Sequence, residues 1–183
     1  MDLKFSRAVQ LAREAECEVG RVRSLITRPE EGRHLPVESL YLDAVTGIQE
    51  DRWSHTSWLK LPNGEPDPRV QVSMNNAHVM QLFTGPEPDS IFLCGDNLYV
   101  DFNLTESNLP AGSFLKVGTA ILEVSDVVND ACGKFANRFG TEAFQFVRSP
   151  ENIPYRLRGI FCSIRVSGHV KIDDEITKVS RFS

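Results

Sequence analysis

The feature that most constrains the fold is a series of short segments in which apolar and polar residues alternate, each followed by a turn signal. Such alternation is typical of β-strands with one buried face, and Gly, Pro, Asn and Asp mark the turns between them. Many short strands with few helices predict a mainly β protein with a barrel or closed sheet rather than alternating βαβ units. We expect strands at 19–26, 35–42, 69–74, 98–102, 114–117, 120–124, 159–166 and 170–176.

Helices are expected to be few and short. The polar stretch 54–68 contains Pro62, Asn63-Gly64, Pro66 and Pro68 and predicts a long loop. The first two strands, 19–26 and 35–42, are expected to form an antiparallel pair. Four helical segments are expected from spacing, capping residues and stop signals: 5–16; from Asn75 or Asn76 to Phe83; 131–139, capped by Asn129 or Asp130 and ended by Gly140; and 142–147, capped by Thr141.

Length and composition indicate one domain. A chain of 183 residues with 41% hydrophobic residues can bury a core without disulfides or metals. We expect an N-terminal arm or short helix at 1–18, a β-barrel domain at 19–178 and a C-terminal tail at 179–183.

The charge pattern argues against nucleic acid or a membrane as partner. The net charge is −5 and the arginines are dispersed, whereas nucleic-acid-binding domains carry a basic patch. The N-terminus lacks a basic region followed by an apolar one, and no apolar stretch approaches the roughly 20 residues of a membrane span. We expect a cytoplasmic protein.

The cysteines are expected to be reduced thiols. Their spacing gives no Cys-x-x-Cys pair, and the histidines form no i,i+4 pair, so a zinc site made only of protein ligands is not expected. The four are Cys17, Cys94, Cys132 and Cys162.

Several segments, in this order and spacing, resemble the MOSC domain. They are Gly95-Asp-Asn-Leu-Tyr-Val-Asp, the stretch 109–124 that begins Leu-Pro-Ala-Gly-Ser, and Cys132-Gly-Lys-Phe-Ala-Asn-Arg-Phe-Gly. Upstream, Gly47-Ile-Gln-Glu-Asp-Arg-Trp is similar to the family's Gly-apolar-x-Gly-Asp-Arg segment, and 158–170 resembles its closing strand and turn. The resemblance implies a β-barrel of the MOSC type with a few short helices.

The resemblance also implies a function. The family is named after the C-terminal domain of molybdenum cofactor sulfurases, and its members are linked to sulfur transfer or to molybdenum cofactor reductases that act on N-hydroxylated compounds. The expected cofactor is therefore molybdopterin. The 183 residues contain no pyridoxal phosphate sulfurase domain and no companion β domain of the amidoxime reductases. Pyridoxal phosphate would enter only through a separate sulfurase, and other proteins would supply cofactor, sulfur or electrons.

Three positions depart from the family pattern. Glu50 stands where the family usually has Gly before Asp-Arg, so a backbone shape that needs Gly is expected to change. The residues 128–131, Val-Asn-Asp-Ala, replace the Arg-x-Pro that often precedes the family cysteine, which removes a cation. The late Gly-Asp is Asp173-Asp174.

Cys132 is the candidate catalytic residue and metal ligand. In the first turn of the helix expected at 131–139, unsatisfied N–H groups and the helix dipole favour the thiolate, and Lys134 adds positive charge while Asp130 opposes it. A thiolate can bind a soft metal or carry a persulfide. From position alone a free cysteine is more often a buried apolar residue, and only the resemblance reverses that inference. Cys17, Cys94 and Cys162 keep the buried interpretation.

Seven further residues are candidate cofactor contacts. Asp51 and Arg52 follow a turn signal and are expected to face the open end of the barrel, with Arg52 binding a phosphate or pterin; a surface ion pair is the alternative. Asp96 and Asn97 can orient a ligand or form an ordinary turn. The remaining three can add anion contacts or lie in solvent: Lys134, Arg138 and Arg158.

Three functions remain open on the sequence. The first is a molybdenum cofactor domain, with Cys132 as ligand, that reduces a small N-hydroxylated substrate by oxo transfer. The second is a sulfur carrier that receives a persulfide on Cys132 from a pyridoxal phosphate-dependent desulfurase. The third, favoured by Glu50 and by Asn129-Asp130, is a non-catalytic module that binds a small molecule.

Overall fold

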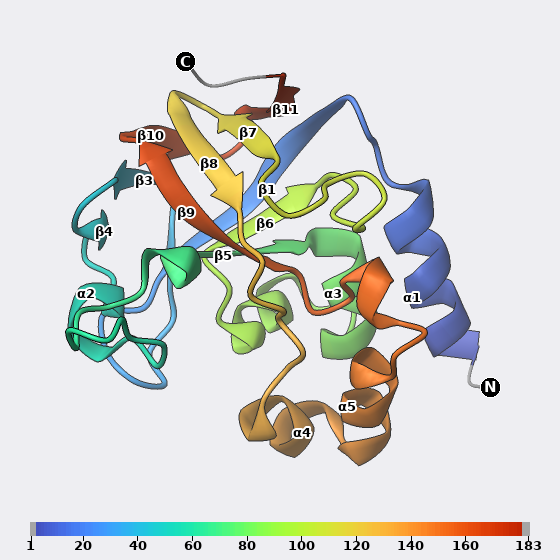
Figure 1. The fold of residues 1–183 in the computed structure, drawn as a ribbon. Coiled ribbons are helices and arrows are strands. Elements are labelled where there is room, and N and C mark those ends of the chain that lie inside the picture. The colour runs from blue at the N-terminus through green and yellow to red at the C-terminus, as the bar shows by residue number, and fades with distance from the viewer. Residues whose placement is uncertain (1–2, 181–183) are drawn as a thin grey trace.

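The main feature of the computed structural model is a closed β-barrel (Figure 1). The structure describes residues 3–180; residues 1–2 of the expected arm and 181–183 of the expected tail lie outside this range. Within the described range, seven strands close in the order β1-β6-β5-β9-β8-β7-β11, and β11 pairs again with β1. The expected mainly β barrel is confirmed. Its strands are β1 (Val19–Thr27), β5 (Val72–Asn76), β6 (Leu98–Asp101), β7 (Phe114–Val117), β8 (Ala120–Val124), β9 (Ile160–Val166) and β11 (Glu175–Val179).

Strand β1 closes the barrel because it pairs with β11 through its first half and with β6 along most of its length. Gly20 lies where the three strands meet, and a Cβ atom there would come within 2.4 Å of the carbonyl oxygen of Asp101. Only a residue without a side chain fits between strands this close. A shift in register between Val22 and Ser24 adds a bulge that bends β1 around the barrel.

The segment 35–42 forms two strands, not the single strand expected. Strand β2 (Leu35–Val37) pairs with β1, as the antiparallel expectation requires. Strand β3 (Ser39–Asp43) leaves for a small sheet with β4 (Gly47–Ile48) and β10 (Gly168–Lys171). The chain changes partner at Glu38, whose carbonyl accepts a hydrogen bond from Ile172 N at 3.1 Å.

Sequence signals at helix ends are only partly confirmed. Asn76 caps the helix that follows it, because its side chain accepts a hydrogen bond from Val79 N at 3.0 Å. The expected caps Asn129 and Asp130 are wrong, since Cys132 is the N-cap residue. The helices are α1 (Leu3–Glu14), α2 (Trp53–Thr56), α3 (Ala77–Thr84), α4 (Gly133–Phe139) and α5 (Thr141–Arg148), with 3-10 turns η1 (Pro68–Val70), η2 (Pro88–Cys94) and η3 (Ile153–Tyr155).

Two apolar cores stabilise this arrangement. One fills the barrel, and the other lies between the outside of the barrel and helices α1, α3, α4 and α5, which gather on one side of it (Figure 1). Strands β5 and β6 are the only parallel neighbours among the barrel strands described, and α3 and η2 form the connection that parallel pairing requires. This connection carries the chain over the outer face of β5. Among residues 3–180, no helix has the length and apolar character needed to span a membrane.

Candidate functional site

A buried polar layer covers the outer face of strand β5. Val72 and Met74 belong to the barrel core, and because side chains alternate along a strand, Ser73 and Asn75 face the opposite way. Both are nonetheless buried, because the segment that starts β6 lies over them. A buried polar group must find hydrogen-bond partners, so this layer fixes the chain around it.

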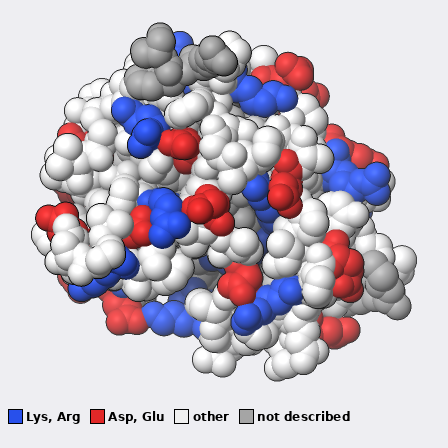
Figure 2. Space-filling view, in the orientation of Figure 1, with Lys and Arg blue, Asp and Glu red and all other residues white. Residues whose placement is uncertain are grey.

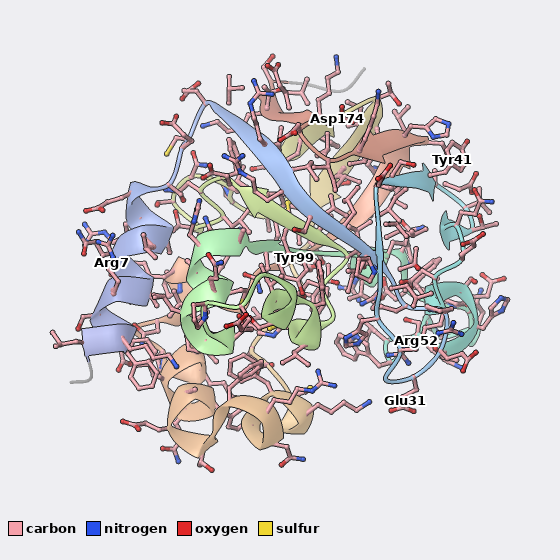
Figure 3. All side chains as sticks on the ribbon, turned by 180° about the vertical axis from the view of Figure 1, so that it is seen from behind. Arg7, Glu31, Tyr41, Arg52, Tyr99 and Asp174 are labelled. Carbon is pink, nitrogen blue, oxygen red and sulfur yellow. The ribbon has the colours of Figure 1, made fainter. Side chains whose placement is uncertain are left out.

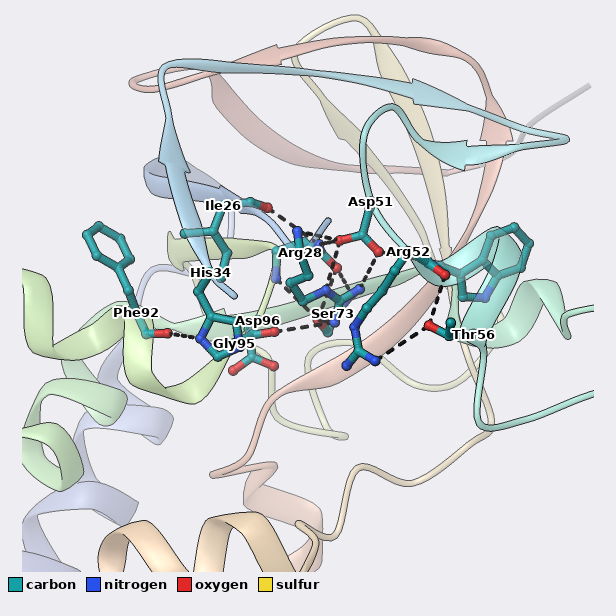
Figure 4. A network of polar contacts seen from close by, with 12 residues as sticks. Ile26, Arg28, His34, Asp51, Arg52, Thr56, Ser73, Phe92, Gly95 and Asp96 are labelled. Carbon is teal, nitrogen blue, oxygen red and sulfur yellow. Dashed lines mark hydrogen bonds and ion pairs between the residues drawn. The ribbon is translucent and has the colours of Figure 1, made fainter. Parts of the chain in front are cut away.

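Asp51 is the centre of this layer (Figure 4). Its carboxylate is fully buried and forms a two-pronged ion pair with Arg28, with Nε at 2.9 Å from Oδ2 and Nη2 at 3.1 Å from Oδ1. The backbone N–H groups of Arg28 and Trp53 and the side-chain amide of Asn97 also donate to it. Asp51 therefore lies where β1 ends and β6 begins, and its two oxygens are already taken up by five hydrogen bonds.

Asn97 joins the carboxylate of Asp51 to the barrel. Its Nδ2 donates to Asp51 Oδ2 at 2.9 Å, while its Oδ1 accepts from the backbone and hydroxyl of Ser73, both at 3.1 Å. The side chain is thus saturated on both sides. Asn97 acts by positioning the loop 47–53 against β5.

Asp96 and Arg158 form a second buried pair. Arg158 Nη1 lies 2.5 Å from Asp96 Oδ2, and the side chains are 12% and 2% exposed. Asn75 also donates to this carboxylate, and Arg158 Nη2 donates to the carbonyl of Cys94. Burial alone would lower the pKa of Arg158, but the charge and hydrogen bond of Asp96, together with Cys94 and Tyr99, outweigh it and hold this pKa above its usual range. The positive charge of Arg158 is therefore already neutralised by Asp96.

Arg52, in contrast, keeps its charge available. It is half-buried, and the side-chain contact recorded for it is a long hydrogen bond of 3.5 Å to the hydroxyl of Thr56. The charge of Arg52 also acts on Glu31. The hydrogen bond and charge of Lys134, together with the charge of Arg52, hold the pKa of Glu31 below its usual value. Figure 3 shows Glu31 and Arg52 close to each other on the same side of the molecule. The alternative that Arg52 pairs with Asp51 is excluded by the Arg28–Asp51 pair.

Helix α4 carries the candidate cysteine and is attached to this region by three contacts. Lys134 pairs with Glu31, Arg138 donates to the carbonyl of Leu93, and the ring of Phe135 lies 5.7 Å from the guanidinium carbon of Arg158. In the space-filling view the surface is hollowed between the α2 segment and α4, with Lys and Arg atoms inside the hollow (Figure 2). The side chains of Lys134 and Arg138 remain exposed.

Cys132 is the exposed cysteine of the chain and lies directly before α4. It is the N-cap residue, in extended conformation, and its side chain makes no capping hydrogen bond. The residue before it, Ala131, has a φ of 68°, so the chain turns sharply into the helix. Burial raises the pKa of the thiols of Cys94 and Cys162 to about 12, which makes both unreactive.

Glu50 adopts a backbone conformation that favours glycine. Its φ is 63°, in the left-handed region. Its side chain is exposed, and the next residue, Asp51, donates its N–H to the carbonyl of Ile48 at 3.0 Å, so a tight turn forms with glutamate at this position. Asp51 therefore contacts Arg28 although glutamate precedes it.

Sequence reasoning missed Arg28 and His34. Arg28 follows β1 directly, and the signal that could have found it is the need of a buried Asp51 for a cation. His34 lies between β1 and β2 and is half-buried, with Nδ1 2.7 Å from the carbonyl oxygen of Phe92. In the sequence, only its position in a loop marks His34 as a candidate.

The chemistry of the site is that of one exposed thiol at the start of a helix that also carries the cations Lys134 and Arg138. Among residues 3–180, no group of three His, Cys, Asp or Glu side chains is placed to hold a metal ion. The indole N–H of Trp53, which follows Arg52, is buried without a hydrogen-bond partner among the described residues. A soft sulfur donor on a helix that also carries ammonium and guanidinium groups fits a metal group that carries a phosphate.

Substitutions at the neighbouring residues Asp51 and Arg52 are expected to differ sharply in their effect on stability. Asp51→Asn should lower the free energy of unfolding by about 3 kcal/mol, because it leaves the buried charge of Arg28 without a counter-charge. Arg52→Gln, the matched control, should change it by less than about 0.5 kcal/mol. Urea unfolding of the three proteins measures this, and equal stabilities for the two variants would contradict the assignment of Asp51 as a structural residue.

The cysteines are expected to react at very different rates. Cys132 should be alkylated fastest by iodoacetamide in the folded protein, because it is exposed at a helix N-terminus near Lys134. Cys94 and Cys162 should react only after denaturation. A peptide-resolved labelling time course decides this, and a Cys132 as slow as Cys162 would remove the basis for a reactive thiolate.

Solved structures of other proteins share this fold. The YUAD protein from Bacillus subtilis has a TM-score of 0.61 at 18% identity, with 86% of this chain and 94% of that chain covered. YiiM from Escherichia coli has a TM-score of 0.57 at 21% identity, covering 89% of this chain and 71% of that one. For YiiM from Geobacillus stearothermophilus the TM-score is 0.54 at 16% identity, with 88% and 76% covered. Identities this low establish the fold alone.

The sequence itself matches one family. No protein with a curated functional description matches it. The model of the MOSC domain matches residues 66–177, which include Asp96, Asn97 and Cys132. Because this match spans more than half of the 183 residues, the chain belongs to the MOSC domain family.

Proposed function

We propose that this MOSC domain binds the molybdenum cofactor beside helix α4 and reduces a small N-hydroxylated compound by oxo transfer. The observation that carries the proposal is the exposed sulfur of Cys132 at the N-cap of α4, a helix that also carries the exposed cations Lys134 and Arg138. Separate proteins would deliver the cofactor and the electrons.

The residues divide into those that would hold the cofactor and those that position them. Cys132 would be the thiolate ligand, and Arg52, Lys134 and Arg138 would donate hydrogen bonds to its phosphate. Lys134 is free to do so because an exposed ion pair such as Lys134–Glu31 contributes little. When bound, the cofactor supplies a metal centre for oxygen-atom transfer.

Asp51, Asp96, Asn97 and Arg158 would act through other residues. Their polar atoms are bonded to one another and to Arg28, Ser73 and Asn75. Arg158 contacts residues before and after the cysteine in the sequence. Its carbonyl accepts a hydrogen bond from Asn129 at 2.8 Å, and its guanidinium lies over the ring of Phe135. These contacts fix the direction in which Cys132 enters α4.

Molybdenum content tests the proposal. Protein purified from a cofactor-competent host should contain molybdenum, and Cys132→Ser should contain at least roughly tenfold less, since loss of a ligand exceeds the effect of losing a supporting contact. Cys17→Ser, at a partly buried cysteine outside the site, is the matched control and should equal the wild type. Wild-type protein that holds no molybdenum and takes none up on reconstitution would refute the proposal.

A sulfur-carrier function is the second candidate, and the exposure of Cys132 favours it, because a partner protein can reach the sulfur. In this function the Cys132 thiolate attacks the terminal sulfur of a persulfide on a pyridoxal phosphate-dependent desulfurase. A new S–S bond forms on Cys132 while the partner's S–S bond breaks, and the partner leaves as a thiolate. No external oxidant is needed.

Mass spectrometry separates the two functions. After incubation with a cysteine desulfurase and cysteine, the peptide that contains Cys132 should gain one sulfur atom, whereas Cys132→Ser should gain none. Cys17→Ser should gain sulfur as the wild type does. Sulfur spread over several cysteines, or absent from Cys132, would count against a carrier role.

A further inference from the structure

Four consecutive carbonyl groups beside the site are all occupied by side chains of basic residues. The carbonyls of Phe92, Leu93, Cys94 and Gly95 accept hydrogen bonds from His34, Arg138, Arg158 and Arg28, respectively. These donors come from the β1–β2 loop, from α4 and from the residue before Gly159. The carbonyl groups at the end of η2 thus hold four basic side chains in place beside one another.

The bond to Phe92 fixes which nitrogen of His34 carries the proton. A carbonyl oxygen only accepts, so in the neutral ring Nδ1 is protonated and Nε2 presents a lone pair. No described residue is hydrogen-bonded to Nε2, and the ring is half-buried. His34 thus contributes a fixed acceptor among groups that otherwise donate.

Gly95 keeps space beside that nitrogen. A Cβ atom at Gly95 would lie 2.7 Å from His34 Nε2, and the φ of Gly95 is +76°. The absence of a side chain at Gly95 thus allows both the positive φ of the turn and the close approach of the His34 ring. Asp96 and Asn97, the next residues, belong to the buried polar layer, so Nε2 lies at its edge (Figure 4).

Burial and, to a smaller extent, three surrounding arginines favour the neutral form of the ring. Burial, together with Arg138 of α4, Arg28 after β1 and Arg52 before α2, lowers the pKa of His34, and the hydrogen bond to Phe92 opposes this only in part. The lone pair of Nε2 is consequently available at neutral pH. Arg52 and Arg138 stand close enough to act on His34 electrostatically, so a ligand bound to these cations would be near the acceptor.

We propose that His34 determines ligand specificity at this site: its Nε2 accepts a hydrogen bond from the O–H group of a ligand held by Arg52 and Arg138. The ligand class is a small compound with a hydroxyl donor next to a carbonyl or anionic oxygen, and the N-hydroxylated class rests on the proposed function. An analogue that lacks the hydroxyl leaves the acceptor unpaired and binds less well.

The test compares benzhydroxamic acid with benzamide, which lacks the N-hydroxyl group. Wild-type protein should bind the hydroxamic acid roughly tenfold more tightly, the value of one hydrogen bond. His34→Asn keeps a donor for Phe92 but has no acceptor at the Nε2 position, so the affinity ratio should fall to about one. His34→Gln places an amide oxygen near that position and should restore the preference. His169→Asn, at the exposed histidine of β10, is the matched control and should keep the wild-type ratio.

Nitrogen-15 NMR of the histidine rings gives a readout that does not depend on activity. The Nε2 resonance of His34 should be that of an unprotonated nitrogen at neutral pH and should shift with benzhydroxamic acid but not with benzamide. The proposal would be overturned if benzhydroxamic acid does not bind, if both compounds bind equally well, or if the affinity ratio is unchanged in His34→Asn.

Molybdenum content of the same preparations keeps this result separate from the proposed function. If no preparation contains molybdenum and the ratio still depends on His34, the cofactor function fails and the acceptor role stands. If molybdenum is bound through Cys132 but the affinity ratio does not depend on His34, the acceptor role of His34 fails and the cofactor function stands.

Discussion

The ion pair between Arg28 and Asp51 is the interaction on which the site depends. Removing both charges from water is costly, and the cost is offset only when each remaining donor and lone pair is satisfied. Asp51 meets this requirement through Arg28, Trp53 N and Asn97, which lie after β1, at the start of α2 and before β6. One carboxylate thereby fixes three loops from distant parts of the sequence. Its position on the outer face of β5 decides where a ligand can and cannot reach.

The two buried carboxylates also sort the arginines into two kinds. Arg28 and Arg158 are neutralised by Asp51 and Asp96, so their effect on a ligand is through the shape of the loops they hold. Arg52 and Arg138 have no carboxylate partner among the described residues, and Lys134 has only the exposed Glu31. The chain as a whole is acidic, with a net charge of −5, yet this region is locally basic. Local charge rather than net charge therefore sets which ligands it attracts.

The sequence was informative where structure depends on neighbouring residues and uninformative where it depends on distant ones. Alternation located the barrel strands, and Asn76 and Gly140 marked helix ends because caps are local. The break at Glu38 could not be foreseen, since it follows from the choice of β10 as partner of β3. Asn129 failed as a cap for the same reason: its amide is used by the carbonyl of Arg158. In the site, Asp51 and Asn97 were found as residues, but their partner Arg28 was not.

The cations near Cys132 show why a motif departure need not remove a physical property. The family's arginine before the cysteine is replaced here by Val-Asn-Asp-Ala at 128–131, and the negative charge of Asp130 is paired with Arg148. Positive charge reaches the region instead from Arg52, which follows the turn at Glu50, and from Lys134 and Arg138 on α4. Electrostatic potential depends on distance in space, and two of these three groups lie within two turns after the cysteine. A motif lost from one side of Cys132 is thus compensated from the other side and from the α2 segment.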